Sequence, residues 1–320
     1  MVRGLRWPIP NCWARSGHHA PPGLLYDTPL SPDHAGMAKI ADLLAQGRTL
    51  SFEFSAPRDL EGERRLTRTL ERLSALRPAF MSVTYGAGGS SRGPTPEVVR
   101  QIIVLGVTGM PHLTCVSHTR EEVSALLDTY AEMGVENLLA LHGDLPPGTD
   151  EVPAGHFTHA IDLVALARVR TDWSVGVAAH PEGHPKATNA VADLEHHAQK
   201  LAAADFAITQ FFFRVEYYEQ FVEAMVKRGI HTPVIAGIMP PINVEGIERM
   251  AALNGTDFPR EIIARLEAAG DDVDARRLIA IEEATRLGEA LLAAGAPGLH
   301  LYTMNFSEPS RTIAQNLGLA

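Results

Sequence analysis

The stretch FAITQFFFRVEYYEQFVEAMVKRGIHTPVIAGIMP, residues 206–240, contains the unit from which the fold is built. Its two ends, 206–213 and 233–240, are largely apolar at successive positions. Strands of a parallel sheet have this composition because helices cover the sheet. Between them, residues 218–229 carry the apolar spacing of a helix that buries one side. The stretch therefore predicts a strand, a helix and a second strand parallel to the first.

The same alternation recurs along the rest of the chain. Helical patterns such as residues 120–134 separate short apolar runs, which lie at 49–55, 80–86, 112–117, 137–144, 173–180, 206–213, 233–240 and 299–305. Eight strands alternating with helices predict an α/β fold, a (β/α)8 TIM barrel, with a doubly wound open sheet as the alternative. The longer interval from 240 to 299 is predicted to hold two or three helices.

Two segments of different character divide the chain. Residues 1–36 are rich in Pro, Gly and His and show no periodicity, so we expect an irregular N-terminal arm that is disordered or loosely packed. Residues 37–320 contain all the periodic patterns and are predicted to form the catalytic barrel.

The composition excludes several classes of function. The 320 residues include 28 Lys and Arg against 38 Asp and Glu, for a net charge of −10. An acidic chain without a basic run indicates no nucleic-acid partner and no membrane surface. Two cysteines, Cys12 and Cys115, cannot build a disulfide framework, which favours a reducing compartment, the cytoplasm.

Polar side chains occur at or near the ends of most predicted strands. In a barrel of this kind the chemistry lies at the carboxyl ends of the strands. The residues concerned are Glu53, Thr84, His112, His142, Asp144, His180, Gln210 and Tyr302. They predict a ligand site at that end of the barrel.

Two carboxyl groups are the candidates for acid and base chemistry. Glu53 lies between Phe52 and Phe54, and apolar surroundings would favour its protonated form, so it is a candidate general acid. Asp144 ends another predicted strand and would stay charged. The alternatives are an arginine partner for Glu53 inside the barrel, a turn or N-cap role for Asp144, and a backbone-satisfying role for Gln210.

His180 and His184 raise the question of a metal. They are four residues apart, but the segment HPEGHP contains two prolines and is not helical, so helical spacing does not apply. No metal site is predicted, and a metal-dependent barrel hydrolase is kept as an alternative.

Eight motifs in order resemble one known family, the flavin-containing methylenetetrahydrofolate reductases. The resemblance extends from about residue 40 to the C-terminus, and its motifs are SFEFSAPR (51–58), SVTYGAGG (82–89), PHLTC (111–115), ALHGDLPPG (140–148), AAHPEGHPKA (178–187), DFAITQFFF (205–213), GIMP (237–240) and GLHLYTMN (298–305). It implies that a nicotinamide dinucleotide, NADH or NADPH, reduces bound FAD, and that 5,10-methylenetetrahydrofolate then becomes 5-methyltetrahydrofolate in a ping-pong reaction of one-carbon metabolism.

The resemblance also implies residue roles. Glu53 matches the general acid and Asp144 the carboxylate near flavin and pterin, while Gln210 and Tyr302 match substrate-binding positions. The positions implied for FAD are Thr84, His112, His142, Gly143, Asp144, Ala179, His180, His184, Asp193, His196 and Lys200. Family members are often oligomeric, so a homo-oligomer is a further expectation.

Some residues depart from the family pattern. His142 stands where bacterial members usually have Arg, and His180 where they have Tyr. Gln199 replaces a basic residue of some members. Val244 stands where an aromatic residue stacks on the substrate in some members, and Phe306 replaces an Arg that often follows the motif at 302–305. Fewer positive charges would weaken binding of a diphosphate. A flavin-independent reductase and a non-catalytic folate-binding homologue are therefore the alternatives.

Overall fold

The structure is a computed structural model that describes residues 38–85, 94–116, 118–143 and 157–320. Eight parallel strands close into a barrel in chain order, with β8 paired to both β7 and β1. They are β1 (Thr49–Ser55), β2 (Phe80–Thr84), β3 (Gly109–Thr114), β4 (Asn137–Leu141), β5 (Ser174–Ala179), β6 (Phe206–Thr209), β7 (Val234–Ile238) and β8 (Gly298–Tyr302). The predicted barrel is confirmed, and the open sheet is wrong because β8 pairs with β1.

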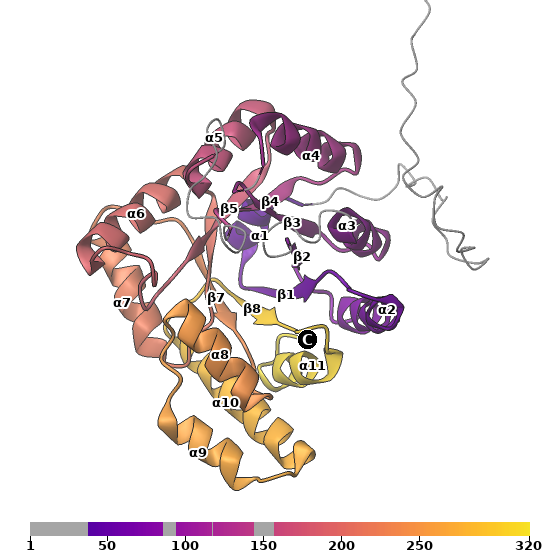
Figure 1. Ribbon diagram of the computed structural model, residues 1–320, viewed down its shortest axis with the longest axis vertical. Coiled ribbons are helices and arrows are strands. Elements are labelled where there is room, and N and C mark those ends of the chain that lie inside the picture. The colour runs from indigo at the N-terminus through magenta and orange to yellow at the C-terminus, as the bar shows by residue number, and fades with distance from the viewer. Residues whose placement is uncertain (1–37, 86–93, 117, 144–156) are drawn as a thin grey trace, which may run out of the picture. The chain divides into compact units, whose positions relative to one another are not determined.

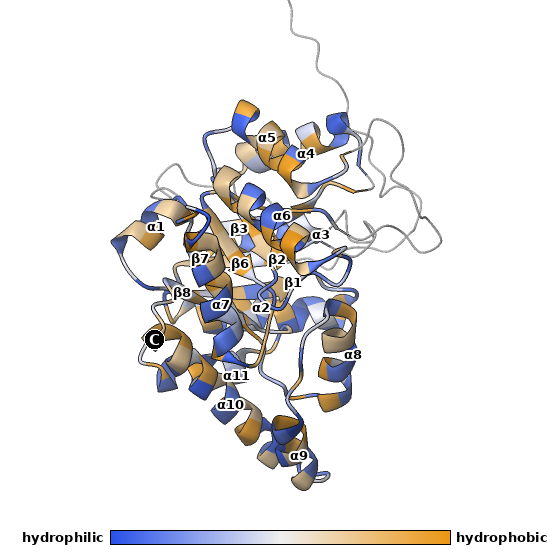
Figure 2. Cartoon of the chain, turned by 90° about the vertical axis from the view of Figure 1, so that its left-hand side faces the viewer, coloured by the Kyte–Doolittle hydropathy of each residue, from blue (hydrophilic) through white to orange (hydrophobic). Residues whose placement is uncertain are grey.

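Helices surround this barrel (Figure 1). They are α1 (Ile40–Gln46), α2 (Leu60–Ser74), α3 (Pro94–Val104), α4 (Arg120–Glu132), α5 (Ala160–Arg170), α6 (Ala190–Ala203), α7 (Val215–Val226), α8 (Val244–Asn254), α9 (Arg260–Ala268), α10 (Val273–Ala293) and α11 (Ser307–Asn316). The interval predicted to hold two or three helices contains α8, α9 and α10. Figure 2 shows that the helices carry hydrophilic and hydrophobic residues side by side, as one-sided burial requires.

One short helix closes the amino end of the barrel. Asn137, at the start of β4, accepts the Ile40 amide at 2.7 Å and donates to the Ala38 carbonyl at 3.0 Å. These bonds hold α1 under the strands. Ile40 packs there against an apolar layer of interior side chains that includes Phe80 and Phe206. The amino end is thus filled, and the carboxyl end is left for ligands.

The run 206–213 does not form one strand. β6 ends at Thr209, and the chain then turns out of the sheet, so Gln210 is the first residue beyond the strand and not its middle. Phe211 and Phe213 leave the barrel and join a second core with α8, α9 and α10, which includes Ile247 and Leu266. The run is largely apolar on both sides of Gln210 because its two halves enter two different cores.

Several other predicted boundaries change in the same way. β4 ends at Leu141, whereas the apolar run was predicted to continue to 144, and β3 begins at Gly109, whereas its run was predicted from 112. Residues 1–36 lie outside the described residues, as do Cys12 and Asp144. Cys115 is buried with a free thiol. No helix within the described ranges has both the length and the apolar character to cross a membrane.

We predict that Gly176→Ala destabilises the protein. An added Cβ at Gly176 would lie 2.3 Å from the ring of Phe206, which is fully buried. Overpacking of this kind costs about 1–3 kcal/mol and should lower the melting temperature by several degrees. Gly109→Ala is the matched control, since its nearest neighbour would be 3.4 Å away. Equal melting temperatures for the two variants would contradict this account.

Candidate active site

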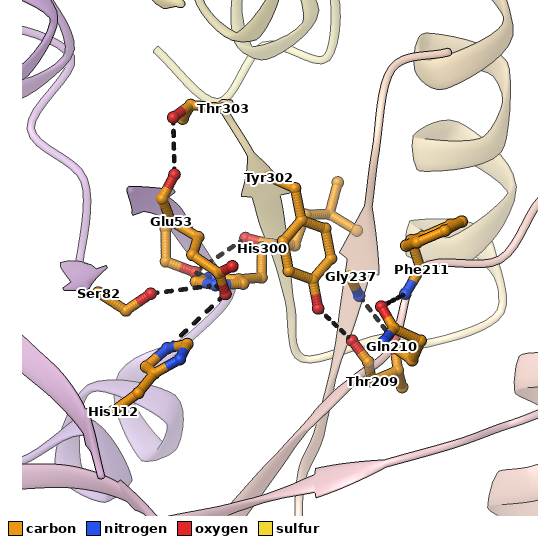
Figure 3. A network of polar contacts seen from close by, with 12 residues as sticks. Glu53, Ser82, His112, Thr209, Gln210, Phe211, Gly237, His300, Tyr302 and Thr303 are labelled. Carbon is orange, nitrogen blue, oxygen red and sulfur yellow. Dashed lines mark hydrogen bonds and ion pairs between the residues drawn. The ribbon is translucent and has the colours of Figure 1, made fainter. Parts of the chain in front are cut away.

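The predicted substrate residues meet at the carboxyl end of the barrel. Glu53 comes from β1 and Tyr302 from β8, and Gln210 follows β6 (Figure 3). His112 of β3, which was predicted to contact FAD, lies beside Glu53. Glu53 and Tyr302 are paired neighbours across the β1–β8 closure. Asp144, the second candidate carboxylate, lies outside the described residues.

Glu53 lies among histidines. Its Oε2 is 3.3 Å from His300 Nε2 and 3.7 Å from His112 Nε2, and its side chain is 15% exposed. The apolar surroundings expected from Phe52 and Phe54 are wrong, because successive side chains of a strand point to opposite faces. Among the described residues no arginine pairs with the carboxyl group, and its ionisable neighbours are the imidazoles of His300 and His112.

His300 is the functional candidate that the sequence analysis missed. Its ring is fully buried, with Nδ1 2.8 Å from Ser51 Oγ and Nε2 3.3 Å from Ser82 Oγ (Figure 3). It also stacks on Phe80 at a centroid distance of 5.7 Å. The ring position is therefore fixed on both edges and one face. The sequence feature that could have indicated His300 is its position two residues before Tyr302. This spacing puts both side chains on the same face of a strand.

The Glu53–His300 pair can hold a proton at either atom. A protonated Glu53 carboxyl can donate to His300 Nε2, or an Nε2–H can donate to the carboxylate. Ser51 Oγ can hydrogen-bond to Nδ1 in either tautomer. It can donate to an unprotonated Nδ1, or accept from Nδ1–H while its own hydroxyl donates to the Leu299 carbonyl at 3.2 Å. The site therefore contains a carboxyl group with a proton-sharing neighbour.

His112 is a neutral neighbour of this pair. Burial lowers its pKa to about 4, and this effect outweighs the attraction of Glu53. His112 Nε2 is buried without a hydrogen-bond partner among the described residues. It is thus a polar atom available to a ligand at the barrel mouth.

Gln210 and Tyr302 form the wall of the site next to Glu53 (Figure 3). Gln210 Oε1 accepts the Phe211 amide at 3.0 Å, so part of the backbone-satisfying alternative holds, although the bond is to the next residue. Tyr302 donates its hydroxyl to the Thr209 carbonyl at 2.7 Å, and burial raises its pKa well above the usual value. Gly237 gives this ring its space, since a Cβ there would lie 2.8 Å from it.

The predicted cofactor residues form a second group at the ends of β4 and β5 and on α6. His180 and His184 contact edge to face at 4.7 Å, and Lys200 donates to the Ala178 carbonyl at 2.9 Å. Asp193 accepts the His184 amide at 3.1 Å. The remaining positions surround these: Thr84 ends β2, Ala179 ends β5, His142 and Gly143 follow β4, and His196 is exposed on α6.

The charge of this group is small. Burial and, to a smaller extent, nearby Lys200 together lower the pKa of His180 to about 3. Burial also lowers the pKa of Lys200 to about 8. At pH 7 His180 is therefore a neutral imidazole, whereas Lys200 is mostly a charged ammonium.

The metal alternative gains no support from the geometry. Among the described residues, no group of three His, Cys, Asp or Glu side chains is arranged to hold a metal ion. His184 uses its Nδ1 to accept the Lys186 amide at 3.1 Å.

An FAD diphosphate and its sugars fit the donors that are present. His180 Nδ1 is buried and lacks a hydrogen-bond partner among the described residues, which is costly without a ligand. Lys200 supplies a cation and Asp193 an acceptor on the adjoining helix. The residues that would hold the cofactor therefore combine imidazole donors, a cation and a carboxylate.

Acid pH should destabilise the protein through His112. An unfolded histidine titrates near pH 6.5, whereas the folded pKa of His112 is about 4, so between these values the unfolded state binds the extra proton. The stabilising contribution of neutral His112 to the free energy of unfolding is fully present above about pH 6.5. It should be smaller by about 2 kcal/mol at pH 5. Urea unfolding of wild type and His112→Gln at pH 7 and pH 5 measures this. The same pH dependence in both proteins would contradict the assignment.

Comparison with known proteins identifies the family. The family model described as methylenetetrahydrofolate reductase matches residues 38–318. The chain is 38% identical over 272 residues to the 5,10-methylenetetrahydrofolate reductase of Salmonella typhimurium, covering 84% of this chain and 90% of that protein. It is 36% identical over 297 residues to methylenetetrahydrofolate reductase (NADH) 1 of Arabidopsis thaliana, covering 88% of this chain and 50% of the plant protein.

A solved structure has a similar fold. It is a Clostridium thermocellum protein described as binding two copies of 5-methyl-5,6,7,8-tetrahydrofolic acid, with a TM-score of 0.60 and 15% identity over 88% of this chain and 98% of that one. At this identity the likeness concerns the fold alone. On the extent of the family match and the identity to its bacterial members, this chain belongs to the methylenetetrahydrofolate reductase family.

Proposed function

We propose that this protein reduces 5,10-methylenetetrahydrofolate to 5-methyltetrahydrofolate with NADH or NADPH, using bound FAD in a ping-pong reaction. The observation that carries the proposal is Glu53, an inward-facing carboxyl group at the barrel mouth with a proton-sharing partner in His300. The names of the relatives supply the substrate, and the NADH-dependent plant protein favours NADH as the reductant.

The substrate must lose one carbon–nitrogen bond before it can accept hydride. Glu53 would donate its proton to the nitrogen that leaves the methylene bridge, and the bridge then opens to an iminium cation. Hydride addition to the iminium carbon gives the methyl product. General acid catalysis of this kind contributes about 10²–10⁴-fold to the rate.

The surrounding residues position and polarise the substrate. Gln210 offers an amide, which supplies a donor and an acceptor together, as the edge of a pterin ring demands. Tyr302 supplies an aromatic wall, and Asp144 would stabilise the cation by its negative charge. Histidines at positions 112 and 300 stay close to Glu53 and hold its carboxyl in place.

FAD, when bound, supplies a store of hydride between the two substrates. His180, His184, Asp193 and Lys200 would hold it, together with His142, Gly143 and Thr84 at neighbouring strand ends. The small positive charge of this group favours a second candidate, a flavin-independent reductase in which nicotinamide and folate bind together.

We predict that Glu53→Gln blocks folate reduction while leaving reduction of the bound flavin by NADH near the wild-type rate. The amide keeps the size of the side chain but cannot donate the required proton, so folate turnover should fall at least about 100-fold. Stopped-flow absorbance measures both half-reactions. Glu289→Gln, on the exposed side of α10, is the matched control and should behave as wild type. Normal folate turnover in Glu53→Gln would refute its role as the acid.

The cofactor is tested by one anaerobic absorbance experiment on the purified protein. A yellow protein should bleach on addition of NADH and regain its colour when methylenetetrahydrofolate follows. A colourless protein that oxidises NADH only with folate present would instead establish the flavin-independent reaction. Colourless and inactive protein after added FAD would indicate a folate-binding homologue without turnover.

A further inference from the structure

His197 on α6 is a buried histidine to which no role in the site has been assigned. It is 2% exposed, and its ring packs edge to face on Phe221 of α7 at 5.2 Å and on His180 at 5.8 Å. It is the neighbour of His196, the exposed histidine for which cofactor contact was expected. Of this pair, His197 is the one that reaches the β5–α6 loop.

The contact of His197 with the loop fixes its tautomer. The backbone amide of His180 donates to His197 Nε2 at 2.8 Å, so this nitrogen presents a lone pair. The ring proton must then lie on Nδ1, which is 3.8 Å from Asp193 Oδ1. Burial lowers the pKa of His197 to about 2, which keeps the ring neutral and its Nε2 an acceptor.

Asp193 and His197 hold the two ends of the same loop. They are one helical turn apart on α6, and Asp193 accepts the amide of His184 while His197 accepts that of His180. The segment between these amides is the turn HPEGH. Two buried acceptors on one helix face thus set the position of both histidine backbones.

The far side of the loop is also fixed. Glu182 accepts the Asp257 amide at 2.7 Å, and Pro185 lies close to Gly255, where an added Cβ would be 3.6 Å from the proline Cβ. The loop therefore lies between α6 and the segment that joins α8 to α9. Removing one anchor should shift the loop rather than release it.

We propose that His197 is a positioning residue, which holds the His180–His184 loop in the shape that receives FAD. The inference rests on the proposed function for its ligand, but the anchoring contact itself is independent of the cofactor. The reason is geometric: the His180 side chain, with its unpartnered Nδ1, follows directly from the amide that His197 holds.

The test compares two substitutions of His197 in the full chain. His197→Leu fills the space but removes the acceptor and leaves the half-buried His180 amide unpaired. His197→Gln can put its amide oxygen near the former Nε2 and restore the bond. His231→Leu is the matched control, since His231 is exposed before β7 at the amino end of the barrel.

Two measurements are made on each protein. Quenching of FAD fluorescence on titration with apoprotein gives the dissociation constant of the FAD complex. Hydrogen exchange gives the protection of the loop amides. We expect His197→Leu to bind FAD about tenfold more weakly and to exchange faster at the His180 amide, which loses its acceptor. His197→Gln should lie within about threefold of wild type in both measurements, and His231→Leu should equal wild type.

The outcomes test the positioning role of His197 separately from the assignment of FAD as the cofactor. If wild type and His197→Leu bind FAD with equal dissociation constants, the positioning role is overturned and the cofactor assignment stands. Equal weakening in the Leu and Gln variants would also overturn it, because loss of packing alone would then explain the effect. Wild type that binds no FAD would overturn the cofactor assignment and, with it, the purpose given to the loop.

Discussion

The pairing of β8 with β1 is the contact on which the site depends. It closes the barrel and places Glu53 beside Tyr302, residues almost at opposite ends of the described chain. Beyond the strands, Asn305 continues the closure, since its side chain accepts the Ser55 amide and donates to the Ser55 carbonyl. Without this closure the carboxyl group of Glu53 would have no His300 beside it.

Closure also explains why polar and apolar groups are separated along the barrel axis. The amino end is filled by large side chains and by Ile40 from α1, which excludes water from that half. The next inward positions carry Ser51, Ser82 and His300, whose hydrogen bonds satisfy one another. The Glu53 carboxyl group lies on top of this buried layer of fixed side chains and is partly exposed on its other side. Fixed neighbours of this kind favour proton transfer with little rearrangement.

Neutral histidines give the site an unusual electrostatic character. Burial lowers the pKa of His112, His180 and His197 to about 4, 3 and 2 respectively, so none of them carries charge near pH 7. Each can then act as a directional donor and acceptor. At His197 this property fixes a loop, while His112 and His180 each keep a buried ring nitrogen without a hydrogen-bond partner among the described residues. A charged ring in the same places would have to overcome the cost of its burial.

The sequence by itself determined the eight strands, their parallel order and the barrel class, because buried parallel strands need continuous apolar runs and helices need one-sided ones. It also pointed to Glu53, Gln210 and Tyr302, since polar residues near strand ends stand out against apolar runs. It could not show that Phe211 and Phe213 enter a second core, because an apolar residue carries no sign of which core will bury it. Nor could it show the neighbours of Glu53: Phe52 and Phe54 are adjacent in the chain but point away, while His300 is distant in the chain and in contact. The tertiary structure decided these points, because side-chain environment depends on strand alternation and barrel closure rather than on sequence proximity.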